Sequence, residues 1–418
     1  MRYLLLFTSL LFFIFPISTT AEEMVTVRLV NKIGNIPKLE FRLEGGYSTF
    51  SPMLTVKEGV TYSLKVEKGK LILQGADMKI ILNDSLVLIP EKYNTNQRVY
   101  INGQPYLGAM EFQVEKEKYI RPVNQLPLDD YLKGVVPFES YPSWPLETLK
   151  AQALAARTYA VSHMNQPMND TIQYQVYGGY QWKESSTKAV EETRGEVITY
   201  KGKLIDAFYS ASNGGITENN SHVWKEKALP YFPIKRDPYD PTYPWEFSLE
   251  RVQVELKKID WNYPNWWQGT VEEDLEIVSV MKRWLARNGY PGDIKVLAVP
   301  HFEISEETLE SGRSLRGSIS VDFLHRLPEG TIMFERVSLE NVALDRIRPM
   351  IGGTTFKSYL IESFKENGST YTVKGLGFGH GVGMSQWGAA VMGEQGKSYR
   401  EIIEFYYPGT SLENIYEE

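Results

Sequence analysis

Short apolar runs separated by turn residues dominate the chain after residue 22. Residues 25–30 and 79–82 are rich in Val, Ile and Leu, and Gly, Asn and Pro separate such runs. This pattern is typical of short β-strands joined by turns. It predicts a strand-rich N-terminal module over residues 22–105.

Helical spacing begins further along the chain. Residues 146–163 are rich in Leu and Ala after Pro145, which predicts a helix packed closely against its neighbours. Apolar residues at 275–285 recur at helical spacing before a Gly, and strand-like runs follow at 294–299 and 318–323. Ser398 and Glu401 form a capping box before a last short helix. The expected fold class is α+β.

The N-terminus resembles an export signal. Arg2 precedes an apolar run at residues 4–15, and small residues follow Pro16. We expect a signal peptide at residues 1–21, with an uncleaved anchor as the alternative, because the run is short for a membrane-spanning helix. Either interpretation places the protein outside the cytoplasm, secreted or anchored at the cell wall. Membrane contact is expected only through an uncleaved N-terminal segment.

Composition narrows the function. The 418 residues suggest two or three domains, and the net charge of −7 argues against nucleic acid as a partner. The chain has no Cys and five His, so we expect no metal site and no cofactor. The 26 Tyr and 9 Trp suit sugar recognition, although most such rings serve a protein core.

Glu139 is the first candidate for catalysis. It lies between a strand-like apolar run and a proline-bounded loop, with Phe138, Tyr141 and Trp144 nearby in the sequence. A carboxyl group beside apolar rings tends to have a raised pKa and can act as a general acid near neutral pH. A solvated loop glutamate is the alternative.

Three further segments carry candidate binding residues. On the predicted helix, polar side chains could bind sugar hydroxyls or form a solvated stripe. A segment with hydroxyl groups before a Gly-Gly pair could be a binding loop or a hairpin turn. A stretch of glycines at alternate positions around His380 could be an extended chain with one bare face, in which His380 is a binding residue or a core histidine. The candidates for substrate binding are Lys150, Gln152, Arg157, Tyr159, Tyr209, Ser210, Ser212, Gly214, Gly215, His380, Gly381, Met384, Ser385 and Gln386.

Together these segments resemble the stage II sporulation protein D and amidase-enhancer family of bacterial cell-wall proteins. The resemblance is carried by residues 128–162, by FYSASNGGIT at 208–217 and by GFGHGVGMSQWG at the start of residues 377–410. This chain reads Glu139-Ser140-Tyr141-Pro142 where members usually read Glu-Met-Pro. The Cys-containing metal site of some members is not expected, because the chain has no Cys.

The resemblance implies a function. Its better-studied members are lytic transglycosylases that cleave peptidoglycan glycan strands, at the MurNAc-GlcNAc bond, after the stem peptides have been removed. Glu139 matches their catalytic general acid/base. The implied architecture is a mixed α/β catalytic domain with a groove at residues 106–418, interrupted by a less family-like insert around 240–340. The role would be cell-wall remodelling, with sporulation as one setting.

The amidase-enhancer branch implies a different class of function. Such a protein would bind glycan and activate a cell-wall amidase without cleaving the strand. The expected partners are therefore glycan strands and, in this alternative, a cell-wall amidase. Sequence alone does not separate the two functions.

Overall fold

The computed structural model describes residues 23–50, 54–75, 78–83, 85–171 and 174–416. They form helices together with strands in several sheets, which confirms the α+β class. The expected signal peptide lies outside the described residues. Within them, no helix is both long enough and apolar enough to cross a membrane.

The N-terminal strands form sheets that pack around one core. One sheet has the order β12 (Met168–Asn169), β1 (Met24–Arg28), β11 (Tyr119–Pro127), β10 (Ala109–Glu115), β7 (Ser85–Pro90) and β3 (Tyr47–Thr49). Another has the order β6 (Met78–Leu82), β5 (Lys70–Gly75), β4 (Thr61–Glu67), β2 (Lys38–Glu44), β8 (Arg98–Ile101) and β9 (Gln104–Tyr106). Buried side chains such as Phe41, Leu88 and Phe112 come from both sheets. The expected strands at 25–30 and 79–82 are present as β1 and β6.

We expected this module to end near residue 105, but its sheets run to Pro127. The first strand, β1, pairs antiparallel with β11, from Met24 opposite Pro127 to Arg28 opposite Val123. Strand β10 pairs with both β11 and β7. Strand β1 therefore forms its hydrogen bonds with a strand that lies after residue 105, and the N-terminal sheets extend past that residue.

A helical region follows the sheets. Its elements are α1 (Leu128–Lys133), α2 (Val136–Glu139), α3 (Leu146–His163), α4 (Glu184–Glu192), β13 (Glu196–Tyr200), β14 (Lys203–Leu204), β15 (Tyr209–Ser210) and α5 (Asn220–Trp224). The chain returns here with β22 (Met384–Ser385), α9 (Gln386–Glu394), α10 (Tyr399–Tyr406) and β23 (Ser411–Asn414). Helix α3 has the bounds that its sequence predicts and is buried over most of its length. The capping box of α10 is also confirmed.

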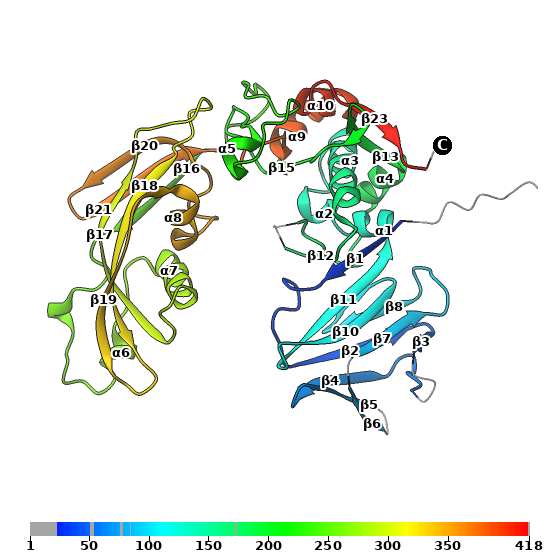
Figure 1. The fold of residues 1–418 in the computed structure, drawn as a ribbon, viewed down its shortest axis with the longest axis horizontal. Coiled ribbons are helices and arrows are strands. Elements are labelled where there is room, and N and C mark those ends of the chain that lie inside the picture. The colour runs from blue at the N-terminus through cyan, green and yellow to red at the C-terminus, as the bar shows by residue number, and fades with distance from the viewer. Residues whose placement is uncertain (1–22, 51–53, 76–77, 84, 172–173, 417–418) are drawn as a thin grey trace, which may run out of the picture.

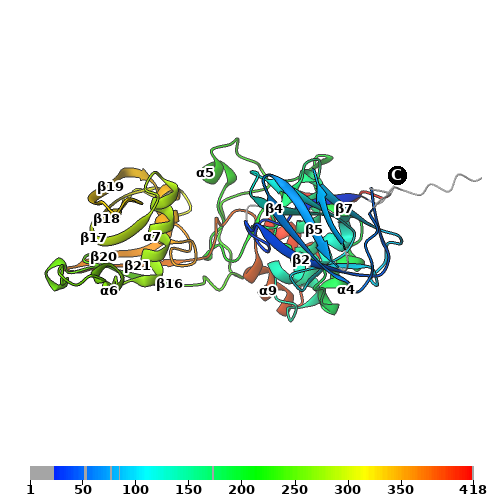
Figure 2. The same cartoon turned by 90° about the horizontal axis from the view of Figure 1, so that it is seen from below.

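The remaining elements form a separate lobe, coloured green to orange (Figure 1). They are β16 (Trp245–Glu250), η1 (Leu256–Lys258), α6 (Trp266–Gly269), α7 (Leu275–Arg287), β17 (Asp293–Ile304), β18 (Arg316–Arg326), β19 (Ile332–Ala343), α8 (Leu344–Ile351), β20 (Leu360–Asn367) and β21 (Thr370–Leu376). They enclose a hydrophobic core of their own. Figure 2 shows the same separation from below. We call these elements the insert lobe; they span residues 245–376, further than the 240–340 that the sequence suggested.

Asp170 ties the helical region to the N-terminal module. Its carboxylate is fully buried and accepts hydrogen bonds from the backbone N–H groups of Val30, Asn31 and Lys32 at 2.6, 2.7 and 2.9 Å. Such charge-assisted bonds fix the loop after β1 against β12.

Replacing this carboxylate should destabilise the protein locally. Asp170→Ala leaves three backbone donors without their acceptor, which should cost about 3 kcal/mol, and Asp170→Asn should cost less. Hydrogen exchange at residues 30–32 should become much faster. Asp260→Ala, which removes an exposed carboxylate, is the control. Unchanged protection in Asp170→Ala would contradict this role.

Candidate active site

Glu139 lies at the end of the short helix α2. The sequence suggested a strand before it, but Pro137 stands in the first turn of a helix and Ser140 ends that helix in an extended conformation. The hydroxyl of Ser140 donates to the carbonyl oxygen of Val136 at 2.8 Å, which stabilises the end of the helix. The strand prediction was wrong because a proline early in an apolar run favours a helix start as well.

The carboxyl group of Glu139 is held by a segment that follows α3. The backbone N–H of Val176 donates to Oε1 of Glu139 at 2.6 Å. Burial raises the pKa of the Glu139 carboxyl to about 7, and the contacts with Val176 and Gln386 offset only part of this effect. The residue as a whole is half-buried. Its carboxyl therefore has a pKa suited to proton transfer near neutral pH.

A chain of buried polar groups lies next to this carboxyl. The hydroxyl of Tyr131 donates to Oε1 of Gln175 at 3.2 Å, and Nε2 of Gln175 donates to the hydroxyl of Tyr209 at 3.1 Å. Burial, followed by the charge of Glu139, raises the pKa of both tyrosines well above the ordinary value. Both hydroxyl groups therefore stay protonated. Tyr209 was a predicted site residue, whereas Tyr131 and Gln175 were not recognised as such.

Gln152 and Gln386 meet beside Glu139. Nε2 of Gln386 donates to the backbone oxygen of Glu139 at 2.7 Å and to Oε1 of Gln152 at 3.3 Å. Both residues are less than a tenth exposed, and Nε2 of Gln152 has no hydrogen-bond partner. A buried donor without a partner is costly unless a ligand or water completes it. The structure thus brings these two predicted residues to Glu139.

Lys150 and Arg157 make ion pairs away from Glu139. Lys150 pairs with Glu147 and Glu192 at 2.8 and 2.7 Å. Arg157 is fully buried and pairs with Asp129 at 3.2 Å. Both residues thus join α3 to α1 and α4, and the structure does not bring them to Glu139. Another predicted residue, Tyr159, stacks on the ring of His163 with centroids 4.1 Å apart.

Asp240 binds two of the three predicted serines. Its carboxylate accepts hydrogen bonds from the hydroxyls of Ser212 and Ser385 at 2.7 and 2.6 Å and from the backbone N–H of Asn213 at 2.9 Å. Strand β15 pairs with β22, which sets Ser210 opposite Ser385. The hydroxyls of Ser212 and Ser385 are therefore committed to Asp240 inside the fold, an acceptor that sequence reasoning missed.

The glycine-rich stretch before α9 is not a regular strand. Gly381 has φ of +77°, and a Cβ atom there would lie 2.1 Å from NH2 of Arg313. Gly214, which lies against Gly377 of this stretch, has φ of +75° and would place a Cβ 2.8 Å from Leu360. Gly214 and Gly215 form a turn, so these glycines permit close packing of the insert lobe on the other lobe. Met384 is buried in a core cluster of the helical region.

His380 is a neutral, packed side chain. Its Nδ1 accepts from the backbone N–H of Val382 at 3.0 Å, and it also bonds the backbone of Tyr209. Burial, followed by the charge of Arg313, lowers the pKa of His380 to about 4. His380 is thus neutral at neutral pH and orients the backbone of Tyr209, whose side chain lies near Glu139.

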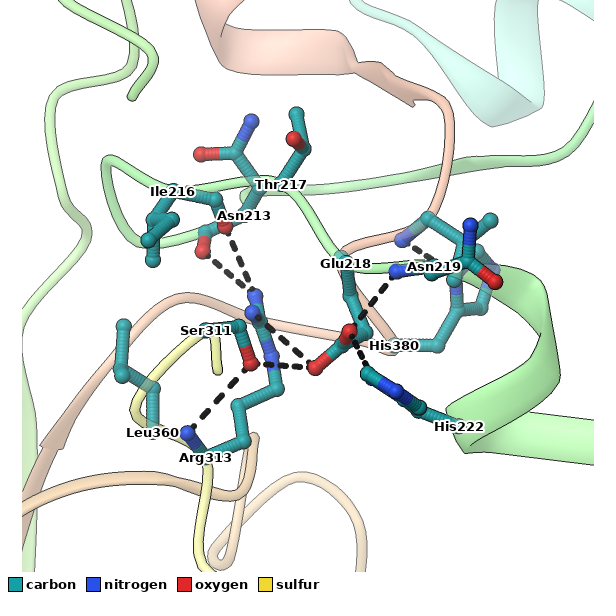
Figure 3. A network of polar contacts seen from close by, with 12 residues as sticks. Asn213, Ile216, Thr217, Glu218, Asn219, His222, Ser311, Arg313, Leu360 and His380 are labelled. Carbon is teal, nitrogen blue, oxygen red and sulfur yellow. Dashed lines mark hydrogen bonds and ion pairs between the residues drawn. The ribbon is translucent and has the colours of Figure 1, made fainter. Parts of the chain in front are cut away.

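Glu218 and Arg313 join the two lobes, as Figure 3 shows. Glu218 is fully buried; its Oε2 accepts from Ser311 and lies 3.7 Å from NH1 of Arg313, while its Oε1 lies 2.8 Å from Nδ1 of His222. NH2 of Arg313 donates to the backbone oxygen of Asn213 at 2.7 Å. A buried pair of this kind fixes geometry more than it adds stability.

The chain is similar to several known bacterial proteins. A model of the stage II sporulation protein family matches residues 116–200. An amidase enhancer of Bacillus subtilis is 40% identical over 85% of this chain and 50% of its own length. An uncharacterized protein of Brachyspira hyodysenteriae is 32% identical over 77% of this chain and 75% of its own length, and stage II sporulation protein D of Bacillus subtilis is 29% identical over 69% and 75%. The chain belongs to the stage II sporulation protein D family.

Membership of this family supports a function related to the cell wall. The chain spans about half the length of the amidase enhancer. No cluster of three or more metal-binding His, Asp or Glu side chains occurs in the described part of this family member.

Two cavities occur elsewhere in the described residues. One of about 390 Å³ lies in the insert lobe beside Tyr263 and Trp266, and one of about 230 Å³ lies beside His222. Glu139 lines neither of them. The expected groove at Glu139 therefore stays a prediction.

The raised pKa of Glu139 predicts how stability depends on pH. Above a pH of about 4.5 the unfolded chain has released the proton that the folded protein keeps until pH about 7. The contribution of Glu139 to the free energy of unfolding is fully present below pH about 4.5, its pKa in the unfolded chain. This contribution is lost as pH rises through about 7, its pKa in the folded protein. Relative to Glu139→Gln, the wild type should thus lose on the order of 3 kcal/mol between pH about 4.5 and 8.

Thermal unfolding over this pH range measures the difference. Glu226→Gln, at an exposed glutamate, is the control and should follow the wild type. Parallel curves for wild type and Glu139→Gln would show that burial does not hold the proton.

Glu218 and Arg313 should be strongly coupled. Arg313→Met leaves Glu218 buried without its cation, which should lower the free energy of unfolding by about 3–5 kcal/mol. Adding Glu218→Gln removes the uncompensated charge, so the double variant should be more stable than Arg313→Met alone. Urea denaturation of the four proteins gives the coupling energy. Additive effects would show that the two groups do not interact.

Proposed function

We propose that this protein is a lytic transglycosylase that cleaves peptidoglycan glycan strands whose stem peptides have been removed. The observation that carries the proposal is the carboxyl of Glu139, held by the N–H of Val176, whose pKa burial raises to about 7. Family membership adds the cell wall as the setting, and the unpartnered amide of Gln152 supplies a donor for a ligand beside this carboxyl. The expected export signal leads us to propose an extracytoplasmic location.

A single carboxyl group can carry the reaction. Protonated Glu139 donates its proton to the glycosidic oxygen as the bond from that oxygen to the anomeric carbon of muramic acid breaks. The 6-hydroxyl of the same muramic acid attacks the anomeric carbon, and its proton passes to the Glu139 carboxylate. The products are a free 4-hydroxyl and a 1,6-anhydro ring, and Glu139 regains its starting state.

The nearby aspartates do not offer the second carboxyl that a hydrolase usually needs. Asp129 pairs with Arg157, and with Arg194 at 3.4 Å. Asp130 pairs with Lys133 at 3.2 Å and accepts from the hydroxyl of Tyr93 at 2.6 Å. We expected a strand between these aspartates and Glu139, but helices α1 and α2 lie there. The ion pairs of the aspartates favour the intramolecular mechanism.

The similarity to an amidase enhancer favours a second function. In that alternative the protein binds glycan and stimulates a cell-wall amidase without cleaving the strand. The identity of 40% to that relative is the observation in its favour. An enhancer would tolerate loss of the Glu139 proton, because binding and not proton transfer would be its task.

Strand cleavage by Glu139→Gln separates the two functions. The substitution keeps the shape and removes the acid, so release of soluble fragments from stripped strands should fall by at least about 100-fold while glycan binding persists. The Glu226→Gln control should cleave like the wild type. For the wild type, the rate should decline above pH about 7 as Glu139 loses its proton. Undiminished release by Glu139→Gln would refute the catalytic assignment.

The products identify the reaction. Mass spectrometry should find 1,6-anhydromuramic ends, which are lighter than hydrolysis products by one water. Reducing ends that contain labelled oxygen from the solvent would instead identify a hydrolase.

Removal of metal ions should leave the activity unchanged. The proposed steps need only Glu139 and the substrate's own hydroxyl group, and the chain has no Cys. Activity after dialysis against a chelator should equal that before it. Loss of activity that only added zinc restores would contradict the prediction.

A further inference from the structure

Four aromatic rings form a continuous surface beside Glu139, which we call the aromatic ledge: Tyr141, Trp144, Trp387 and Tyr243. Ring centroids are 5.2 Å apart for Tyr141 and Trp144, 5.7 Å for Tyr141 and Trp387, and 6.3 Å for Trp387 and Tyr243. Tyr141 is 57% exposed, and the other three rings are partly exposed. Rings this close together usually fill a core, so their exposure suggests a binding surface.

The ledge is continuous with the candidate active site. Tyr141 follows Glu139 by two residues, in the short loop where the chain departs from the family's usual Glu-Met-Pro. Trp387 follows Gln386, whose side chain donates to the backbone oxygen of Glu139 at 2.7 Å. A glycan strand that reaches Glu139 can therefore extend across the ledge.

Tyr243 is held on the ledge in an unfavourable backbone conformation. Thr242 and Tyr243 have φ of 61° and 39°, values that side chains of their size rarely adopt. The carboxylate of Asp240 accepts from the N–H of Thr242 at 2.8 Å, and the N–H of Gly377 donates to the oxygen of Thr242 at 2.8 Å. Strain of this kind is found mainly where a residue serves function.

The insert lobe adds a cation to the ledge. The ammonium of Lys357, which follows α8, lies 4.9 Å from the ring centroid of Tyr243 and 5.7 Å from that of Phe378. The backbone oxygen of Lys357 accepts from Gly379 at 3.0 Å, which fixes this residue to the glycine-rich stretch before α9. Figure 1 shows that α8 and α9 belong to different lobes.

Lys357 has no counter-ion among the described side chains. Lys133 pairs with Asp130, whereas Lys32, whose ammonium lies 4.8 Å from the ring centroid of Phe138, resembles Lys357 in having no ion pair among the described residues. The ammonium of Lys357 contacts only ring faces, and no carboxylate lies within ion-pair distance of it in the part of the chain that the structure describes. In a protein with net charge −7, a partly buried cation without a partner is suited to an anionic ligand.

We propose that Lys357 binds the lactyl carboxylate of a muramic acid while the aromatic ledge packs against the sugar rings, an inference that rests on the proposed function. Hydrolytic removal of a stem peptide converts a neutral lactyl amide into a carboxylate. Each stripped muramic acid thus has a negative charge at the position where an unprocessed one has an amide. Lys357 is in this account a specificity-determining residue that selects stripped strands.

Matched strands test this selection. One set keeps free lactyl carboxylates, and the other has the same carboxylates converted to neutral methylamides. Binding is measured in the Glu139→Gln background, and cleavage with Glu139 intact. The Lys357 protein should prefer the free carboxylate about tenfold, in keeping with one charge-assisted contact. Lys357→Met should lose the preference, and Lys357→Arg should retain most of it.

Two further variants serve as controls. Lys374→Met removes an exposed lysine of the same lobe, which pairs with Glu246, and should keep the preference. Tyr141→Ala should weaken binding of both strands equally, since packing on a ring does not depend on the charge. High salt should reduce the preference in the Lys357 protein and leave Lys357→Met unaffected.

The outcomes separate this inference from the proposed function. The inference is overturned if Lys357→Met still prefers strands with free carboxylates, or if the protein with Lys357 intact shows no such preference. Cleavage without this preference leaves the proposed function in place. Preferential binding without cleavage supports the inference and overturns the catalytic function. Failure to bind either strand overturns the inference as well.

Discussion

The removal of the Glu139 carboxyl from bulk water is the constraint on which the site depends. The carboxyl is held by the N–H of Val176, its backbone by the side chain of Gln386, and the surrounding hydroxyls come from Tyr131 and Tyr209. These segments are far apart in the sequence, so the site exists only in the complete fold. The same burial that raises the pKa of Glu139 also costs stability at neutral pH. A fold that tolerates this cost gains an acid that is protonated where cleavage would occur.

Buried carboxylates elsewhere give the site its rigid surroundings. Asp240 binds Ser212, Ser385 and the strained turn at Thr242, so one side chain positions three segments around α9. Glu218 and Arg313 join the insert lobe to the same region. Placement of Lys357 and Tyr243 relative to Glu139 therefore depends on interactions that connect both lobes, and the insert lobe becomes part of substrate recognition.

Local patterns predicted much of the fold. Helix α3 and the capping box of α10 follow from proline position, small residues and a Ser-Glu pair, which are properties of neighbouring residues. The short helix α2 was missed because its four residues are too few to show helical periodicity. The extent of the N-terminal module depends on the pairing of β1 with β11, a contact between distant segments that no local pattern reveals.

The candidate site, too, could be predicted from the sequence only in part. A raised pKa of Glu139 was expected from the rings beside it in the sequence, but the groups found at its carboxyl are Val176, Tyr131 and Tyr209. Spacing could not decide whether Lys150 and Arg157 lie at the site, because residues on one helix face can point toward different neighbours. Lys150 pairs with acids of α3 and α4, and Arg157 pairs with an acid of α1. Gln175 and Val176 lie far from Tyr131 and Glu139 in the sequence, so their contacts with these residues are seen only in the folded chain.

The protonation state of Glu139 can be measured in the intact protein. Infrared difference spectroscopy between wild type and Glu139→Gln isolates the absorption of this one carboxyl group. A protonated carboxyl band should be present in the wild type at pH about 6 and should disappear with a midpoint near 7. A carboxylate band already complete at pH 6, with a midpoint near the ordinary value for glutamate of about 4.3, would show that burial does not hold the proton and that the account is wrong.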